Sequence, residues 1–258
     1  MQMEVASYVE LCTRLSRFVQ LQPADTTVKE LTHVLGDVLA LYDRVESCDD
    51  SVRPAVDSPL VTFAAMDDLV LLSMHRLLGG FVLNSSSPKL QERAFAVFSR
   101  VLQRCKPRMS EGNAAHLQRR LAFVQSCVLY LPQPPEAKED SEETAESATF
   151  TSQPEELRLA ILQSLRELLE EDTAEKKSLQ LQADQQHFFA YLVASLLHVA
   201  QRDRCREAAL RAVEVLECVL VFIRDPNTLR QYLPGVSAGL WKCANAPQQI
   251  SKEGQLRD

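Results

Sequence analysis

One pentapeptide of the sequence matches the motif of a catalytic class. Gly235, Ser237 and Gly239 form the pattern GxSxG, which serine hydrolases use to expose a nucleophilic serine on a tight turn between a strand and a helix. The reaction also needs an acid and a histidine base, which follow the serine in that fold. No histidine follows Ser237, and the residues before it have helical spacing. We therefore interpret the match as coincidental, within a turn at Pro234 and Gly235.

The histidines are too scattered to suggest a metal or catalytic site. His33 has Glu30 and Asp37 at helical spacing, but no second histidine or cysteine lies near it in the sequence, so a metal site is unsupported. The sequence also lacks the motifs HExxH, CxxC, GxGxxG and GxxxxGK[ST]. We predict no enzymatic activity, no cofactor, and no catalytic or metal-binding residue. The five histidines are His33, His75, His116, His187 and His198.

The cysteines indicate a reducing compartment. Most of the seven fall on or beside apolar helical faces, where a reduced cysteine packs as a small hydrophobic residue. Their odd number and wide spacing fit a cytoplasmic or nuclear thiol protein better than a disulfide framework. We therefore expect a cytoplasmic protein that is also found in the nucleus. The cysteines are Cys12, Cys48, Cys105, Cys127, Cys205, Cys218 and Cys243.

The composition favours long helices. Among 258 residues there are 38 leucines, three isoleucines and only seven glycines, a balance rich in helix formers and poor in strand formers. The net charge is -7, of which the segment 132–153 contributes -5. No concentration of Lys or Arg indicates nucleic acid or an anionic membrane as a partner. No apolar run approaches the roughly 20 residues that span a bilayer.

Apolar residues at steps of three and four predict a series of amphipathic helices along the chain. Thr27 with Glu30, and Ser152 with Glu155, have the spacing of a capping box and predict two helix starts. Asp203 is a further predicted N-cap. Pro234 and Gly235 are expected to interrupt the last helix. The predicted helices lie near residues 5–22, 27–47, 59–78, 90–106, 114–131, 155–168, 188–200, 204–224 and 228–243.

A repeat connects these helices. The positions of Glu156, Leu162 and Leu165 match those of Glu207, Val213 and Leu216 at a shift of 51 residues, and a third copy begins at Glu92, 64 residues before Glu156. Without the acidic segment the period is near that of two-helix HEAT or armadillo units. We predict an all-α, HEAT/armadillo-like α-solenoid of stacked antiparallel helix pairs. The alternative is that any amphipathic helices with this spacing align in the same way.

The predicted organisation has four parts. Residues 1–131 form N-terminal helical repeats, 132–153 a disordered acidic loop, 154–244 further repeats and 245–258 a flexible polar tail. The loop is either a flexible insertion without a specific role or a phosphorylated segment that recruits an Arg-rich partner. Trp241 either anchors a partner or packs within the solenoid. Candidate phosphate acceptors in the loop are Ser141, Thr144, Ser147, Thr149, Thr151 and Ser152.

Two runs carry a family resemblance. The run from Glu155 to Leu165, and the run Leu233-Pro-Gly-Val-Ser-Ala-Gly-Leu240, resemble the N-terminal region of the Tel-two-interacting protein one family. The resemblance implies a non-enzymatic HEAT-repeat scaffold of the triple-T complex, with Tel-two and Tel-two-interacting protein two as partners. It further implies action with the Hsp90 machinery on phosphatidylinositol-3-kinase-related kinases, including mTOR and the DNA-damage kinases.

The resemblance leaves several points open. Family members continue through many more repeats, so we expect a short isoform or incomplete product whose last repeat exposes apolar surface. Another HEAT or armadillo adaptor, in trafficking or nuclear transport, is an alternative function. A helical ligand-binding bundle is a second alternative, which would show a closed pocket with convergent polar groups. Apolar spacing identifies core faces only, so the partner-binding residues stay unassigned.

Overall fold

The computed structural model describes residues 2–47, 59–109, 114–132, 153–170, 183–223 and 226–245. These residues form nine helices, and the described ranges contain no strand. Each helix has an apolar stripe, as the sequence predicted. The helices are α1 (Gln2–Phe18), α2 (Asp25–Ser47), α3 (Pro59–Gly79), α4 (Pro88–Met109), α5 (Ala114–Val128), α7 (Glu155–Leu169), α8 (Ala183–Arg202), α9 (Arg206–Ile223) and α10 (Pro226–Asn245).

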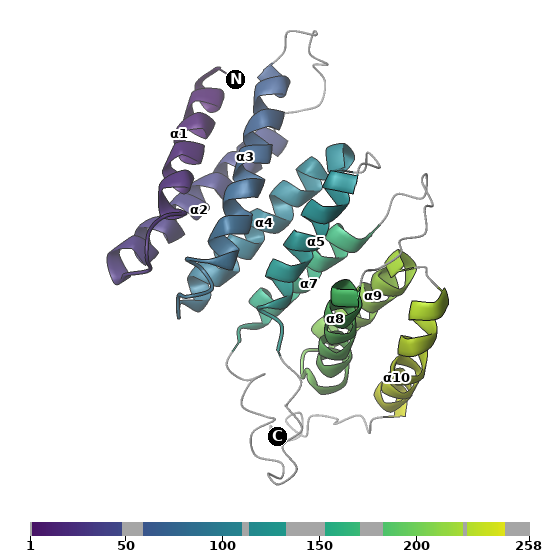
Figure 1. Cartoon of the computed structure of the whole chain (residues 1–258). Helices are drawn as coiled ribbons and strands as arrows, with labels where there is room; N and C mark the ends of the chain where they lie inside the picture. The colour runs from purple at the N-terminus through teal and green to yellow at the C-terminus, as the bar shows by residue number, and fades with distance from the viewer. Residues whose placement is uncertain are drawn as a thin grey trace, which may run out of the picture.

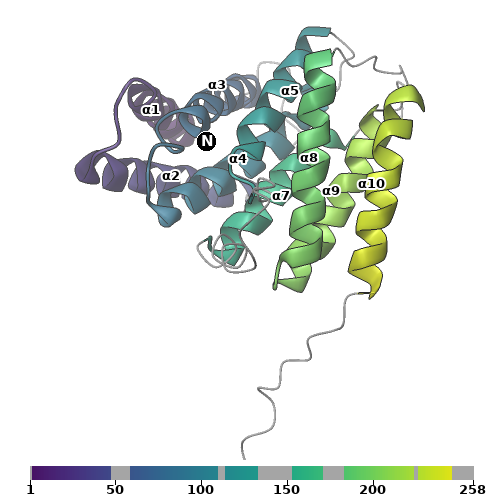
Figure 2. The same cartoon turned by 60° about the horizontal axis from the view of Figure 1, so that its bottom comes forward.

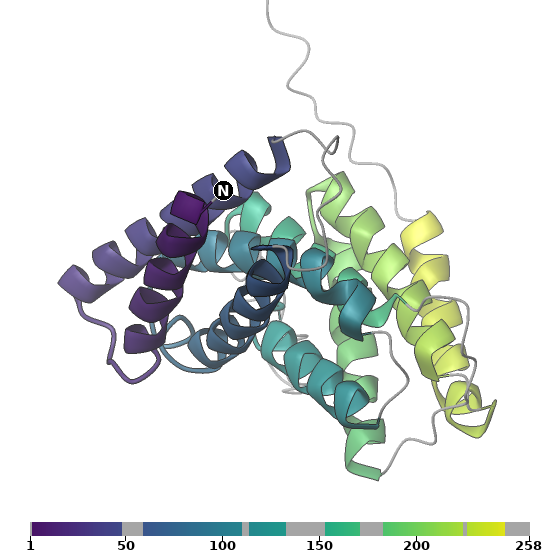
Figure 3. The ribbon, with the colours of Figure 1, turned by 90° about the horizontal axis from the view of Figure 1, so that it is seen from above.

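The helices stack in two layers (Figure 1). One layer contains α2, α4, α7 and α9, each in contact with the next. The other contains α1, α3 and α5, followed by α8 and α10. The contacts pair α1 with α2, α3 with α4, α5 with α7 and α8 with α9, and seen from above these pairs follow one another across the molecule (Figure 3). The chain is therefore an all-α solenoid of helix pairs, which confirms the predicted fold class.

Contacts between neighbouring helices agree with the repeat alignment. Arg166 Nη1 of α7 donates to Glu214 Oε2 of α9 at 3.1 Å, and Gln103 Nε2 of α4 donates to Glu167 Oε1 of α7 at 3.3 Å. These partners are 48 and 64 residues apart. Because both separations are close to the repeat shifts of 51 and 64 residues, α4, α7 and α9 run parallel as equivalents in successive repeats.

A buried polar cluster ties the first two pairs together. The Asp67 carboxylate accepts hydrogen bonds from Tyr8 Oη at 2.5 Å and from Arg104 Nε at 3.1 and 3.2 Å. The Tyr42 hydroxyl lies 2.8 Å from the Tyr8 hydroxyl, and the Arg104 guanidinium stacks over the ring of Tyr42. One side chain from each of α1, α2, α3 and α4 takes part, so the cluster fixes the register of four helices. Its polar groups satisfy one another, as burial requires.

A second buried polar contact joins the later pairs. Arg158 of α7 makes a bidentate ion pair with Asp203, which lies between α8 and α9, at 2.7 and 2.9 Å. Arg158 also donates to the backbone carbonyl of Gln153. The Gln153 side chain in turn donates to the carbonyl of Tyr130 at 2.8 Å. The two segments on either side of residues 133–152 are therefore in direct contact. Residues 133–152 of the predicted acidic loop fall outside the described residues, so the prediction of a disordered loop over 132–153 stays a prediction.

Four local predictions need correction. Asp203 is not the N-cap of α9, which begins at Arg206; its carboxylate accepts instead from Arg158 and from the backbone N–H of Cys205. Helix α10 is continuous through Pro234, because an exposed helix face lets water satisfy the carbonyl that loses its N–H partner. Helix α2 begins at Asp25, two residues before Thr27; the Thr27 hydroxyl instead accepts from the backbone N–H of Ala24, at 2.9 Å. Helix α7 has Pro154, not Ser152, as its N-cap residue.

Candidate protein-binding site

The serine of the GxSxG match lies in the middle of a helix. Ser237 is exposed on α10, whose helical backbone provides no nucleophile elbow. Gly239 has a packing role instead, because a Cβ built there would lie 2.7 Å from Leu197 Cδ2 of α8. Gln201 Nε2 of α8 also donates to the Gly239 carbonyl, at 3.3 Å. The second glycine of the motif therefore allows α10 to approach α8 closely, as seen for these neighbouring helices in Figure 2.

We expect Gly239→Ala to destabilise the protein by about 1–3 kcal/mol, since the added methyl group overpacks the contact with α8. Gly235→Ala is the matched control. A Cβ at Gly235 meets nothing within 4 Å, and alanine has the higher helix propensity, so this variant should be neutral or stabilised by up to about 1 kcal/mol. Urea unfolding followed by circular dichroism measures both. Equal effects of the two substitutions would contradict the packing role.

The structure brings one Ser–His pair together that the sequence analysis did not connect. His75 Nδ1 of α3 lies 3.0 Å from Ser126 Oγ of α5, and Phe123 packs edge-on against the imidazole. Burial, followed by the charge of Arg76, lowers the pKa of His75. Within the described ranges its partners include no carboxylate, and Ser126 is itself buried. The pair thus resembles an inter-helix contact rather than a triad.

The other histidines do not converge. His33 is exposed and lies 3.1 Å from Asp37, while His187 is exposed on α8 and His198 is half-buried. The side chain of His116 falls outside the described residues. In the part of the chain that the structure describes, no three His, Cys, Asp or Glu residues could hold a metal ion.

Buried cysteines should resist alkylation in the folded protein. Desolvation raises the pKa of Cys12 to about 12 and also raises the pKa of Cys127, so at neutral pH both stay protonated and weakly nucleophilic. We expect iodoacetamide to label Cys12, Cys105 and Cys127 at least about tenfold more slowly in buffer than in urea, as measured by peptide mass spectrometry. Cys243, only partly buried, is the internal comparison. Fast labelling of Cys127 in buffer would contradict the buried position.

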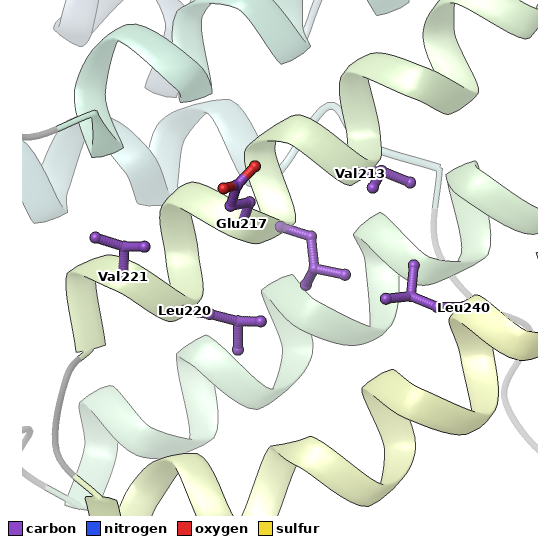
Figure 4. A pocket seen from close by; sticks show the side chains of 6 residues that line it. Val213, Glu217, Leu220, Val221 and Leu240 are labelled. Atoms are coloured by element: carbon purple, nitrogen blue, oxygen red, sulfur yellow. The ribbon is translucent and has the colours of Figure 1, made fainter.

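An apolar groove lies between α9 and α10. Figure 4 shows Val213, Leu220 and Val221 on α9, with Leu240 on α10 across from them. Leu216 forms a further part of the lining, and the volume is about 380 Å³. Glu217 is the one charged residue in the lining. An open apolar groove with a single carboxylate suits an apolar surface of another protein better than a small polar ligand.

Exposed large apolar side chains occur at both ends of the described solenoid, with Val9 42% and Leu21 44% exposed at the N-terminal end. The side of α2 turned away from α4 presents Glu30, His33 and Arg44, all of them polar. On α9, Leu210 is 56% exposed and Val221, which lines the groove, is 50% exposed. Among these residues, Val221 belongs to a groove, and an apolar groove is a candidate contact surface.

The solenoid of paired helices and its apolar end surface define a helical-repeat protein of the kind that serves as a scaffold. Residues 80–254, about two thirds of the chain, match the family described as TTI1 N-terminal TPR domain. The chain belongs to this family, which confirms the resemblance stated from the sequence. No curated protein and no solved structure matches the chain. None of the described helices is long and apolar enough to cross a membrane.

Proposed function

We propose that the chain is a non-enzymatic scaffold of the triple-T complex. In this proposal it binds Tel-two and Tel-two-interacting protein two and, with the Hsp90 machinery, supports the maturation and stability of phosphatidylinositol-3-kinase-related kinases such as mTOR. It does so in the cytoplasm and the nucleus, without a cofactor. The family match over residues 80–254 is the observation that carries the proposal.

The arrangement of the described residues supports a binding role. The Ser–His pair is enclosed between α3 and α5, and Ser237 faces solvent on a helix, so neither presents a nucleophile beside a base in a cleft. The apolar groove and the exposed Trp241 of α10, 72% accessible, instead provide the kind of residues that anchor protein interfaces.

Affinity purification of the tagged chain from its own cells, with mass spectrometry of the recovered proteins, tests this proposal. We expect Tel-two, its second interacting protein and kinase clients among the recovered proteins. Ser237→Ala is the matched control and should recover the same set. Recovery of trafficking or nuclear-transport components alone, or of no triple-T subunit by a chain that circular dichroism shows to be folded, would contradict the proposal.

A further inference from the structure

Helix α3 exposes a stripe of small and apolar residues. Leu69 is 49% exposed and Leu72 is 40% exposed, and Ala65, Arg76 and Gly79 are exposed as well. The steps between these five residues alternate between four and three, so they lie on one side of the helix. The buried residues of α3 occupy the opposite side. We call these five exposed residues the α3 stripe.

The α3 stripe is on a lateral face of the solenoid. Helix α3 lies between α1 and α5 in its layer and contacts both (Figure 1). Tyr8 of α1 bonds to Asp67 of α3, and Ser126 of α5 lies 3.0 Å from His75 of α3. Repeats of a solenoid stack end to end, so a further repeat beyond either end would not cover this face. The occupant of the stripe therefore comes from outside the stack.

The charges on either side of Leu72 make this face complementary to itself. Asp68 is exposed four residues before Leu72, and Arg76 is exposed four residues after it. A two-fold axis through Leu72 would place a second α3 antiparallel to the first, with Asp68 of each copy over Arg76 of the other. The reason is that both residues are about 6 Å from Leu72 along the helix, in opposite directions and with opposite rotations around it. Asp68 Oδ1 lies 3.6 Å from Cys105 Sγ, and a carboxylate can accept several hydrogen bonds.

The ends of the stripe match under the same two-fold axis. Ala65 precedes Leu72 by seven residues and Gly79 follows it by seven, so Ala65 of each copy would lie over Gly79 of the other. A Cβ built at Gly79 meets nothing within 4 Å. Two small residues at each end allow the helices to approach to about 8 Å, the short end of the usual range. At the centre Leu72 would pack against Leu72 of the second copy.

We infer that two copies of the chain associate through the α3 stripe, with their α3 helices antiparallel and Asp68 of each copy paired with Arg76 of the other. A different protein would need the complementary charges and small residues at matching positions, whereas a second copy always has them. This inference goes beyond the proposed scaffold function and does not rest on it.

The dimer should be weak. One pair of helices buries less than the roughly 1,200–2,000 Å² of a stable interface. We therefore expect a dissociation constant on the order of 10–100 µM.

Sedimentation equilibrium of the purified chain tests the inference. Leu72→Asp should weaken the dimer at least about tenfold, because the two-fold axis brings two carboxylates together at the centre. Leu210→Asp is the matched control, since Leu210 is an exposed leucine of α9, and it should leave the dissociation constant unchanged. A wild-type chain that stays monomeric up to about 300 µM, well above the expected constant, would overturn the inference. Equal losses in the two variants would also overturn it.

A mixing experiment tests the pairing of charges. Asp68→Arg alone and Arg76→Asp alone each replace two attractions by two repulsions, so each variant should dimerise about tenfold more weakly than the wild type. In an equimolar mixture the two variants should associate with nearly wild-type affinity, because both contacts of the mixed dimer again join opposite charges. Mixing would not rescue a folding defect, which circular dichroism of each variant checks separately.

Failure of the mixture to associate would overturn the antiparallel pairing. Association of either single variant with wild-type affinity would place the dimer contact elsewhere and would likewise overturn the inference. Since all these measurements use the purified chain, their outcome is independent of whether triple-T subunits are recovered from cells.

Discussion

Asp203→Ala is expected to destabilise the C-terminal repeats by about 3–5 kcal/mol. Both carboxylate oxygens of Asp203 accept hydrogen bonds from Arg158, at 2.7 and 2.9 Å, and the side chains of the two residues are 0% and 8% exposed. Removal of the carboxylate leaves a guanidinium group buried without its counter-charge, which costs far more than the loss of an exposed ion pair. The substitution also removes the acceptor for the backbone N–H of Cys205 at the start of α9.

Two comparisons separate the ion pair from other causes. Asp43→Ala removes an exposed ion pair with Arg100 and should change the free energy of unfolding by less than about 1 kcal/mol. The double variant Arg158→Met, Asp203→Ala should be more stable than Asp203→Ala alone, since it leaves no buried charge. Hydrogen exchange should show the loss of protection concentrated in α7, α8 and α9, which this contact joins. A double variant that is less stable than Asp203→Ala would contradict the explanation.

The sequence predicted most helices and the repeat because both are encoded locally. An apolar stripe with a period of 3.6 residues is visible within one helix, and the equivalence of α7 and α9 depends only on comparing two such stripes. The family resemblance likewise rested on two short runs near Glu155 and Leu233. These features can be recognised in the sequence without knowing which helices are in contact.

The polar clusters and the groove could not be predicted in this way. Asp67 and Arg104 are 37 residues apart, and their sequence neighbours do not show that stacking brings them together with Tyr8. The predicted start of the second helix was wrong for a related reason. Thr27 has the residue type of an N-cap, yet its hydroxyl bonds to Ala24 from inside the first turn, a choice that depends on the path of the chain before the helix.

The sequence also left open which apolar stripe faces the core. Leu162 and Leu210 belong to equivalent helices and to the same aligned pattern, but Leu162 is fully buried, whereas Leu210 is 56% exposed. Periodicity gives the direction of a stripe relative to its helix, and only the stacking order decides whether a neighbour lies there. The partner-binding surface was unassigned from the sequence for this reason.

Leu162→Asp should therefore unfold its repeat, whereas Leu210→Asp should be tolerated. Leu162 of α7 is fully buried in the core, so the substitution leaves a cavity and buries a carboxylate without a partner; we expect a loss of more than about 4 kcal/mol. At Leu210 the carboxylate remains in water, and the loss should be less than about 1 kcal/mol, mainly from helix propensity.

Urea unfolding with circular dichroism gives the two free energies, and hydrogen exchange shows whether protection is lost first in α7 and α9. Comparable stability of the two variants would show that the register of these helices is wrong.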